Sequence, residues 1–558
     1  MLKSHDAWES WRNSFSWNLP RLFNIGNAIT DRWAHEAPER AALVEPLADG
    51  TVRTTSFGAL AEQSNRLASA LRAKGVTRCD RIALLLPQGV ETVVVHAASA
   101  KLGAIAVPLA LLFGEEAIAH RLRGAAPKAL FTTAEGWRKA RGVAGAVPGL
   151  EHVFITDAPD AATTDYHRLL AGGAVDFTPV PTTPDDPALM IFTSGTTGAP
   201  KGALHGHRVL LGHLPGVQAF HESMPEPGDL LWTPADWAWA GGLLNVLMPG
   251  LALGVPVVVH RQGKFDPEEA LETVARLKVR NAFVPPTALR MMRAAGDAVK
   301  RARLNLRTIG SAGEALGRDT FDWAEGAFGI PVNEAYGQTE CNLVLGSSAR
   351  LGVSKGGAIG KPIPGHEVAI LDGEGRPVPR GQPGRIAVRA PDPVMFLGYW
   401  NDEPATREKF LGDWFITGDG GRQDEDGYFH FIGRDDDIIT SAGFRIGPSE
   451  IEDCLAGHPA VRMAAAVGKP DPLRTEIVKA YVVLKDGVAP SDRLAAEIAR
   501  FVRERLSAHE YPREVAFVDE VPLTTSGKVI RRHFRERARC EAEISAGEAA
   551  SSDGCAPA

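Results

Sequence analysis

The sequence lacks the features that mark several special classes of protein. Its cysteines are scattered without a CxxC pair, which supports neither a disulfide framework nor a zinc cage. The net charge is only −7 and no long basic run occurs, so a nucleic-acid partner has little electrostatic support. The amino-terminal segment MLKSHDAWESWRNSF is charged and aromatic and has no continuous apolar stretch typical of a signal peptide. These absences predict a cytoplasmic protein.

A long apolar run is also missing. The most apolar stretch extends from Leu243 to Val259, but Pro249, Pro256 and two glycines interrupt it. This pattern predicts a buried helix, a turn and a strand, and no membrane span. Apolar residues make up 44% of the chain and charged residues 23%, which is ordinary globular usage.

The pattern of apolar residues changes twice along the chain. With 558 residues, the protein is longer than one hydrophobic core usually supports. From about residue 56 to 350, helical patterns alternate with short apolar runs such as RIALLLP and ALMIFTS, which indicates parallel sheets covered by helices. After residue 360, short β-branched segments broken by turns indicate hairpins and a small barrel-like sheet.

A compact mixed pattern of strands and amphipathic helices follows from about residue 437. We therefore predict an α/β fold with a large N-terminal body of stacked α/β subdomains and a small β-barrel-like region, spanning residues 1–435. A small, mobile α+β C-terminal domain is expected over residues 436–540. Residues 541–558 have almost nothing to bury and are predicted to form a disordered tail.

The segment from Ile191 to Gly202, IFTSGTTGAPKG, has the composition of a phosphate-binding loop. Its glycines allow backbone amides to approach anionic oxygens, its hydroxyls donate hydrogen bonds and its lysine supplies a positive charge. The loop differs from the Walker pattern because glycine follows the lysine. A Ser/Thr/Gly surface loop is the alternative, but such density directly after an apolar strand favours polyphosphate. The candidate residues are Thr193, Ser194, Gly195, Thr196, Thr197, Gly198 and Lys201.

This loop resembles the signature loop of the acyl-adenylate-forming superfamily, which includes acyl-CoA synthetases, adenylation domains and luciferases. Further motifs follow in the family's order, and the resemblance extends from about residue 25 to 540. It implies an AMP-forming acid–thiol ligase that joins a carboxylic acid to AMP and then passes the acyl group to coenzyme A. Mg²⁺ is the implied cofactor, and ATP and coenzyme A are the implied co-substrates.

Two motifs, GSAGEA at 310–315 and NEAYGQTE at 333–340, resemble the family's adenine and α-phosphate loops. The resemblance implies that Tyr336 stacks on the base, that Thr339 meets the α-phosphate and that Glu340 binds Mg²⁺, with Thr193 a possible second ligand. An aromatic face suits a purine and a carboxylate suits a hard cation. Without the resemblance, Tyr336 and Glu340 would be interpreted first as a core tyrosine and a surface acid. The other implied nucleotide contacts are Gly313, Glu314, Ala315, Glu334, Ala335, Gly337 and Gln338.

Later motifs resemble the ribose, hinge and C-terminal lysine motifs of the family. Asp419 and Arg434 are implied to bind ribose, since a carboxylate can accept both ribose hydroxyl protons. Arg445 is implied to meet the phosphate end, and Asp436 to be the hinge of the small domain. Lys528, in PLTTSGK, corresponds to the catalytic lysine, although a lysine in such a loop would otherwise be read as solvated.

Coenzyme A contacts are implied at two positions. Gly443 is similar to the family's glycine along the pantetheine path, and Arg503 is a candidate contact for a coenzyme A phosphate. An arginine on the surface of a helix is an equally good interpretation of Arg503.

The prediction of which acid is activated rests mainly on Gly337. Acetyl-CoA synthetases carry a tryptophan there that shortens the acyl pocket, so glycine predicts a deeper pocket, and the phrase YGQTE resembles medium-chain acyl-CoA synthetases. Trp239 and Gly241 are expected to form part of the acyl wall, although tryptophans are as often core residues. His205 and His207 suggest a metal site, but both lie beside the phosphate loop, where the family commonly has histidine.

Three other functions share parts of this pattern. An adenylation enzyme that loads a carrier protein would have all the nucleotide motifs, a non-catalytic nucleotide-binding regulator would have the fold, and a luciferase-like oxygenase shares it too. Glu340 and Lys528 argue against the regulator. The sequence leaves the acid and the oligomeric state open.

Overall fold

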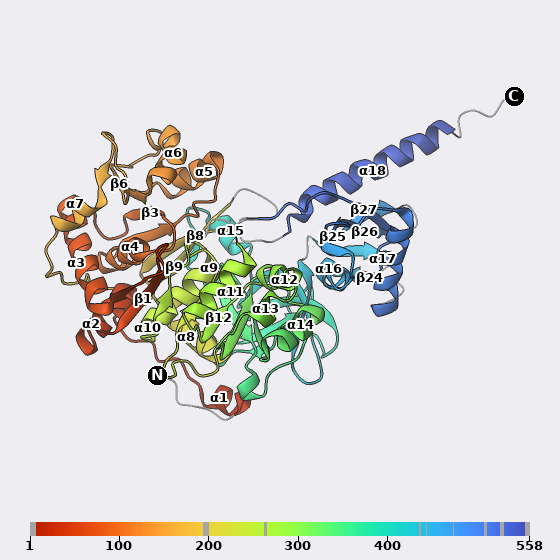
Figure 1. The fold of residues 1–558 in the computed structure, drawn as a ribbon, viewed down its shortest axis with the longest axis horizontal. Helices are drawn as coiled ribbons and strands as arrows, with labels where there is room; N and C mark the ends of the chain where they lie inside the picture. Colours follow the sequence, from red (N-terminus) through yellow and green to blue (C-terminus); the bar gives the residue numbers. More distant parts are fainter. Residues whose placement is uncertain are drawn as a thin grey trace.

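The structure is a computed structural model that describes residues 7–193, 200–261, 265–434, 437–441, 444–471, 474–506, 511–524 and 529–552. It is a mixed α/β fold with two large sheets, a smaller curved sheet and a C-terminal α+β unit, as the sequence predicted (Figure 1). Within the described ranges, none of the helices is long and apolar enough to cross a membrane.

The largest sheet has nine strands and a parallel centre. Its order is β16 (Lys361–Pro362), β15 (Cys341–Gly346), β14 (Val332–Gln338), β13 (Thr308–Ala312), β12 (Asn281–Phe283), β10 (Leu231–Trp232), β11 (Val257–Val258), β1 (Ala41–Pro46) and β2 (Val52–Ser56). The carboxyl ends of β13 and β14 carry the two predicted adenine motifs. Ala312 and Ala335 are register partners, so these motifs lie side by side.

The second sheet has eight strands and carries the phosphate loop. Its order is β19 (Gly398–Tyr399), β9 (Gly202–Gly206), β8 (Pro187–Phe192), β4 (Ile105–Pro108), β3 (Arg81–Leu85), β5 (Ala129–Thr132), β6 (His152–Ile155) and β7 (Thr164–Asp165). The short apolar runs became buried parallel strands because helices cover both faces of such a sheet. The exception is β9, which runs antiparallel to β8.

Two smaller sheets complete the fold. The curved sheet contains β17 (Val368–Leu371), β18 (Pro383–Arg389), β20 (Phe410–Leu411), β21 (Trp414–Gln423) and β22 (Phe429–Arg434). The C-terminal sheet contains β23 (Ile439–Ser441), β24 (Phe444–Ile446), β25 (Val461–Asp471), β26 (Thr475–Leu484) and β27 (Glu514–Phe517). β27 joins β26 in parallel, whereas the other pairings of this last sheet are antiparallel.

Helices cover the first two sheets. In the first half they are α1 (Trp8–Ser14), the π-helical η1 (Asn27–Asp31), α2 (Arg32–Glu36), α3 (Phe57–Ala73), α4 (Val90–Lys101), α5 (Glu115–Ala125), α6 (Ala134–Ala144), α7 (Tyr166–Ala171), α8 (Arg208–Phe220), α9 (Ala240–Gly242), the π-helical η2 (Leu243–Leu247) and α10 (Met248–Ala252). Ser56 and Thr133 cap α3 and α6 through their hydroxyls. The apolar stretch from Leu243 to Val259 forms buried helix, turn and strand, which confirms the prediction.

The remaining helices lie in the second half of the chain. They are α11 (Pro267–Arg276), α12 (Pro286–Ala294), α13 (Ala298–Arg301), α14 (Arg318–Phe328), the 3-10 segment η3 (Ala349–Leu351), α15 (Glu403–Arg407), α16 (Pro448–Ala456), α17 (Asp492–Arg505) and α18 (Arg531–Ser552). The C-terminal unit lies beside α12 and α14, and α18 projects from it (Figure 1).

The structure differs from the sequence prediction in the tail. α18 continues to Ser552, well into the segment expected to be disordered. Phe534 and Ala538 bury the first turns of this helix against the C-terminal sheet, so the helix has a packed start from which it extends. Alanine and glutamate, frequent in this segment, are good helix formers.

Candidate active site

The phosphate loop joins two paired strands. Phe192 of β8 is the register partner of Gly202 of β9, and the Thr193 amide donates to the Lys201 carbonyl over 2.9 Å. The two ends of the loop are therefore adjacent. Lys201 lies 3.5 Å from Asp402, and its side chain is 43% exposed. The predicted contacts Ser194, Gly195, Thr196, Thr197 and Gly198 lie outside the described residues.

The predicted adenine loop is clamped by α12. Both carboxylate oxygens of Glu314 accept hydrogen bonds from the Thr287 hydroxyl, at 2.9 and 2.8 Å, and Arg290 forms a 3.1 Å ion pair with the same carboxylate. Arg290 also donates to the Ala315 carbonyl over 2.9 Å. Gly313 has φ +102°, a backbone conformation that favours glycine. The loop is thus held in shape by side chains that the sequence motifs did not include.

Glu334 is a buried carboxyl group under this loop. The Leu316 amide donates to its Oε1 over 3.1 Å. Burial raises the pKa of Glu334 to about 8. The side chain therefore supports the loop from β14, and its neighbour Ala335 is buried in the same strand.

Residues predicted to contact adenine and ribose meet directly. The Tyr336 hydroxyl donates to Asp419 Oδ2 over 2.5 Å, and the Gln338 amide donates to the same oxygen over 3.2 Å. Arg434 lies opposite Asp419 across β21 and β22, with 3.9 Å between Arg434 Nε and Asp419 Oδ1. Burial, and then the Asp419 charge, hold the pKa of Tyr336 well above its usual value. Segments far apart in sequence thus form one polar cluster beside the adenine loop.

The predicted metal ligand Glu340 is a largely buried carboxylate, with 8% of the residue exposed. Its Oε1 accepts a 2.5 Å hydrogen bond from Tyr399. Across the described ranges, no cluster of three or more His, Cys, Asp or Glu side chains could hold a metal ion. The donor set still fits Mg²⁺, because this ion is commonly held by one or two carboxylates together with substrate phosphates. Glu340 would hold it, with Thr193 at the mouth of the phosphate loop as a possible second ligand.

The predicted acyl wall is aromatic. Trp239 packs edge-to-face against Phe113 with 5.8 Å between ring centroids. A methyl group at Gly241 would lie 3.4 Å from Phe283, in ordinary contact distance. Phe113 and Trp239 belong to one apolar cluster and Phe283 to another, and the role of Trp239 and Gly241 in acyl binding stays a prediction.

Gly337 has a structural role that the sequence did not indicate. A Cβ atom at this position would lie 2.2 Å from the Leu343 amide nitrogen and 2.6 Å from Asn342 Cα. The glycine therefore lets β14 and β15 approach closely, and any larger side chain must displace β15. Its role in acyl-pocket depth stays a prediction, and a substitution here tests hairpin packing as well as pocket size.

The histidines near the phosphate loop are deeply buried. Burial lowers the pKa of His205 to about 3 and that of His207 to about 4, so both rings are neutral at physiological pH. The Ile25 amide donates to His207 Nδ1 over 3.1 Å. His207 thus anchors the chain that enters η1.

The predicted coenzyme A and hinge residues are only partly described. Arg503 is exposed on α17, with its guanidinium 5.4 Å from the Tyr511 ring centroid. The contact of Arg503 with coenzyme A stays a prediction. Asp436, Gly443 and Lys528 lie outside the described residues, and so does the side chain of Arg445 in β24.

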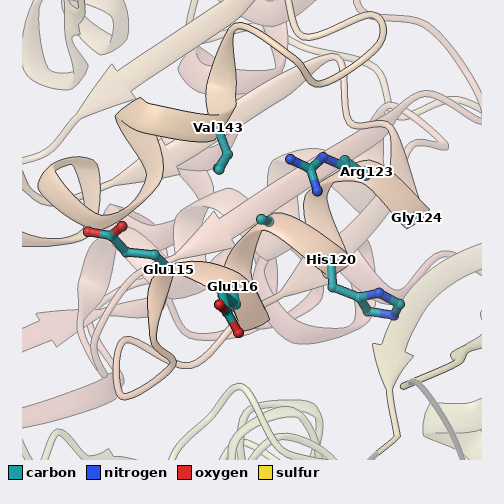
Figure 2. A pocket seen from close by; sticks show the side chains of 7 residues that line it. Glu115, Glu116, His120, Arg123, Gly124 and Val143 are labelled. Atoms are coloured by element: carbon teal, nitrogen blue, oxygen red, sulfur yellow. The ribbon is translucent and has the colours of Figure 1, made fainter.

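A surface pocket of about 580 Å³ lies along α5 (Figure 2). His120 connects it to the phosphate loop, because its Nε2 lies 2.9 Å from the Pro200 carbonyl oxygen. The lining contains both carboxylates and basic side chains, so it does not favour a ligand of either charge. The lining residues are Glu115, Glu116, Ala119, His120, Arg123, Gly124 and Val143.

A carboxylate of the C-terminal unit docks on the large body next to the adenine loop. α14 begins after Gly317, which offers no side-chain cap. Asp453 of α16 supplies one from across the interface, since its carboxylate accepts from the Asp319 amide over 3.3 Å and from the Thr320 hydroxyl over 3.1 Å. A Cβ at Gly317 would lie 2.1 Å from Asp453 Cγ, so the glycine makes room for this contact.

We expect Asp453→Ala to weaken the docking of the C-terminal unit. Loss of a helix cap costs about 0.5–2 kcal/mol, which corresponds to a roughly 2- to 30-fold fall in the ratio of docked to undocked molecules. Spin labels on the two parts of the chain would report the distance distribution between them. Asp486→Ala is the matched control, because that carboxylate belongs to the same unit and is fully exposed. An unchanged distribution in Asp453→Ala would assign the contact no role in docking.

The paired strand ends, the adenine loop held by α12 and the Tyr336–Asp419 contact bring together residues that the sequence predicts to bind a nucleotide. The chain belongs to the AMP-binding enzyme family. The model of this family matches residues 30–400, and the model of the AMP-binding enzyme C-terminal domain matches residues 450–528. The protein is accordingly an enzyme of the AMP-forming CoA ligase class.

Proteins with similar sequences support the family assignment. Acetyl-coenzyme A synthetase of Bacillus subtilis (strain 168) is 35% identical over 86% of this chain and 84% of its own length. Mitochondrial acyl-coenzyme A synthetase ACSM5 of Mus musculus is 32% identical over 93% and 91% of the two chains.

Solved structures agree. The anthranilate CoA ligase AuaEII in complex with anthranoyl-AMP superimposes with a TM-score of 0.87 at 28% identity, covering 94% of this chain and 99% of its own. The Brucella canis acyl-CoA synthetase gives a TM-score of 0.74 at 33% identity, with 96% and 99% covered. Family and fold class were therefore predicted correctly from the sequence.

Proposed function

We propose that this enzyme activates a carboxylic acid of about medium-chain size with ATP and transfers the acyl group to coenzyme A, releasing AMP and pyrophosphate. The observation that carries the proposal is the convergence of Tyr336, Asp419 and Glu340 at the carboxyl end of β14, beside the mouth of the phosphate loop. The aromatic wall around Trp239 supports an apolar acyl group. Mg²⁺, ATP and coenzyme A are the proposed cofactor and co-substrates.

The first half-reaction joins two anions, so positive charge and alignment must lower its barrier. A carboxylate oxygen of the acid attacks the α-phosphorus, and the bond from phosphorus to the bridging oxygen of pyrophosphate breaks with its electron pair on pyrophosphate. Tyr336 and the clamped loop orient the base, Asp419 accepts from ribose hydroxyls, and Lys201 meets the phosphates. Mg²⁺, held by Glu340, supplies charge neutralisation on the phosphate oxygens when bound.

In the second half-reaction the thiolate of coenzyme A attacks the acyl carbonyl carbon of the mixed anhydride. The bond from that carbon to the phosphate oxygen breaks, AMP leaves with the electron pair, and the thiol proton goes to solvent. The proposed conformational change is a rotation of the C-terminal domain about Asp436. The rotation would move Lys528 out of the active site and bring in Gly443, along which the pantetheine arm of coenzyme A would enter. The proposed division is 1–435 for the body, 436–540 for the rotating domain and 541–558 for the tail.

The thiol acceptor can be tested apart from the adenylation chemistry. Preformed acyl-adenylate would be offered to the enzyme together with either coenzyme A or a phosphopantetheinylated carrier protein. We expect thioester formation with coenzyme A only. Transfer to the carrier alone would identify a carrier-loading enzyme, whereas release of pyrophosphate from ATP and an acid excludes a non-catalytic regulator.

We expect hexanoate to octanoate to give the highest kcat/KM in a pyrophosphate-release assay with acids of different length and shape. Each methylene that the pocket accepts should contribute about 1–3 kcal/mol of discrimination, so acetate, which is four methylenes shorter than hexanoate, should be poorer by about 10³-fold or more. Branched acids, benzoate and 2-aminobenzoate complete the panel. A preference for acetate or for an aromatic acid would contradict the medium-chain assignment and leave the adenylation chemistry intact.

A further inference from the structure

One short segment contacts both the phosphate-loop exit and the strand turn that carries Glu340. The Phe396 amide donates to the Glu340 carbonyl over 2.8 Å. Tyr399 then pairs with Ala203 of β9, and the Trp400 amide donates to the Gly202 carbonyl over 2.7 Å. The segment 396–400 therefore bridges two parts of the active site that lie more than a hundred residues apart in sequence.

Tyr399 is placed where these two parts meet. Its hydroxyl donates to Glu340 Oε1 over 2.5 Å, and only 8% of each residue is exposed. The backbone of Tyr399 is held as well, because its amide donates to the Thr406 hydroxyl over 2.8 Å. Packing and hydrogen bonds thus leave the phenol one orientation, with its hydroxyl directed at the carboxylate.

The face of the same ring carries the loop lysine. Lys201 Nζ lies 5.2 Å from the Tyr399 ring centroid, within the range of a cation–π contact, and 3.5 Å from Asp402. Asp402 is oriented by the start of α15, where its Oδ1 accepts from the Ala405 amide over 3.1 Å. The ammonium group thus lies between an aromatic face and a carboxylate, a position that we call its resting place.

We propose that Tyr399 is a positioning residue for nucleotide activation, because it fixes the Glu340 carboxylate and forms, with Asp402, the resting place of Lys201. The hydrogen bond occupies Oε1 of Glu340 and leaves the other oxygen for Mg²⁺. A ligand that is already oriented loses less freedom when the metal binds. The phosphates of ATP would then replace Asp402 as the ionic partner of Lys201, while the Tyr399 ring stays in contact with the lysine. The inference rests on the proposed role of Glu340 as metal ligand.

Metal binding is the direct test. Mn²⁺ would be titrated in the presence of a non-hydrolysable ATP analogue and followed by electron paramagnetic resonance, which does not depend on turnover. Tyr399→Phe should raise the half-saturating Mn²⁺ concentration about tenfold or more, the usual effect of removing a partner of a metal ligand. Metal-free affinity for the analogue should change less than about twofold, since the ring under Lys201 is retained.

Tyr428→Phe is the matched control. Tyr428 is also buried, and its ring contacts two other lysines in place of Lys201, because Lys355 and Lys361 lie over it at 5.1 and 5.0 Å. This variant should leave the Mn²⁺ titration unchanged. An equal shift in both variants, or none in Tyr399→Phe, would overturn the proposal.

Glu340→Gln distinguishes failure of the proposal from failure of the proposed function. If the metal ligand is correctly assigned, Glu340→Gln weakens Mn²⁺ binding and Tyr399→Phe adds no further loss to it. Unchanged Mn²⁺ binding in Glu340→Gln would instead remove the metal site itself.

Asp402→Asn provides a second variant that does not depend on the folding of Tyr399→Phe. It should tighten metal-free binding of the analogue about threefold or more, because Lys201 is no longer held by a carboxylate. No change would contradict the resting place assigned to Lys201.

Discussion

Lys528→Ala is expected to slow adenylate formation by about 10²–10³-fold or more, the effect of losing one preorganised donor at a developing anion. By resemblance to the family, this lysine meets the α-phosphate only when the C-terminal domain faces its adenylating side. Lys528 lies outside the described residues, but its flanks are joined by a bridge between Leu523 and Val529 and by a 2.9 Å bond from the Ile530 amide to the Pro522 carbonyl. The residues on the two sides of the Lys528 segment are therefore adjacent in space.

Transfer of the acyl group from preformed acyl-adenylate to coenzyme A should suffer far less in this variant. Pyrophosphate release and thioester formation would be measured separately, with Lys300→Ala as control because Lys300 is an exposed lysine on α13. Preserved transfer with lost pyrophosphate release supports a domain that rotates between two states. Equal damage to both steps would point to a structural lysine, and unimpaired synthesis would remove Lys528 from the mechanism.

Glu340→Ala is expected to reduce Mg²⁺-dependent adenylation by about two orders of magnitude, because water would have to replace a charged ligand. The change also leaves the buried Tyr399 hydroxyl without its acceptor, so some loss of stability is expected. Isotope exchange between pyrophosphate and ATP, measured as a function of Mg²⁺ concentration, separates the two effects. High Mg²⁺ should restore part of the exchange in Glu340→Gln, which keeps the shape of the side chain.

Glu374→Gln serves as the control for charge, since Glu374 lies in an exposed turn with 71% of its side chain accessible. It should show the wild-type Mg²⁺ dependence. Normal turnover of Glu340→Ala at ordinary Mg²⁺ would exclude Glu340 as a metal ligand and leave it a structural partner of Tyr399.

Several side chains that organise the site had no signal in the sequence. Arg290 and Thr287 clamp the adenine loop from α12, Asp453 caps α14 from the C-terminal unit, and Tyr399 binds Glu340. None of them belongs to a glycine-rich loop or to a recognisable motif. Each acts on a partner that is distant in the chain, such as the 133 positions between Thr320 and Asp453.

Gly337 is a residue that the sequence did single out, but for a different role from the one that the structure shows. The sequence drew attention to this position, and comparison with the tryptophan of acetyl-CoA synthetases suggested open volume. The structure places the backbone of Asn342 and Leu343 directly over its Cα. Only the path of the returning strand reveals that the missing side chain first serves the hairpin.

The sequence by itself determined the alternation of strands and helices, the phosphate loop after β8 and the order of the nucleotide motifs, and through them the family. These features depend on hydrophobic periodicity and on the chemistry of glycine, hydroxyl and lysine side chains, which act over a few neighbouring residues. The tertiary structure alone decided that Tyr336 meets Asp419, 83 positions away, and that Tyr399 meets Glu340, 59 positions away. Such contacts arise from sheet order and strand pairing, which bring together strand ends that are distant in the sequence.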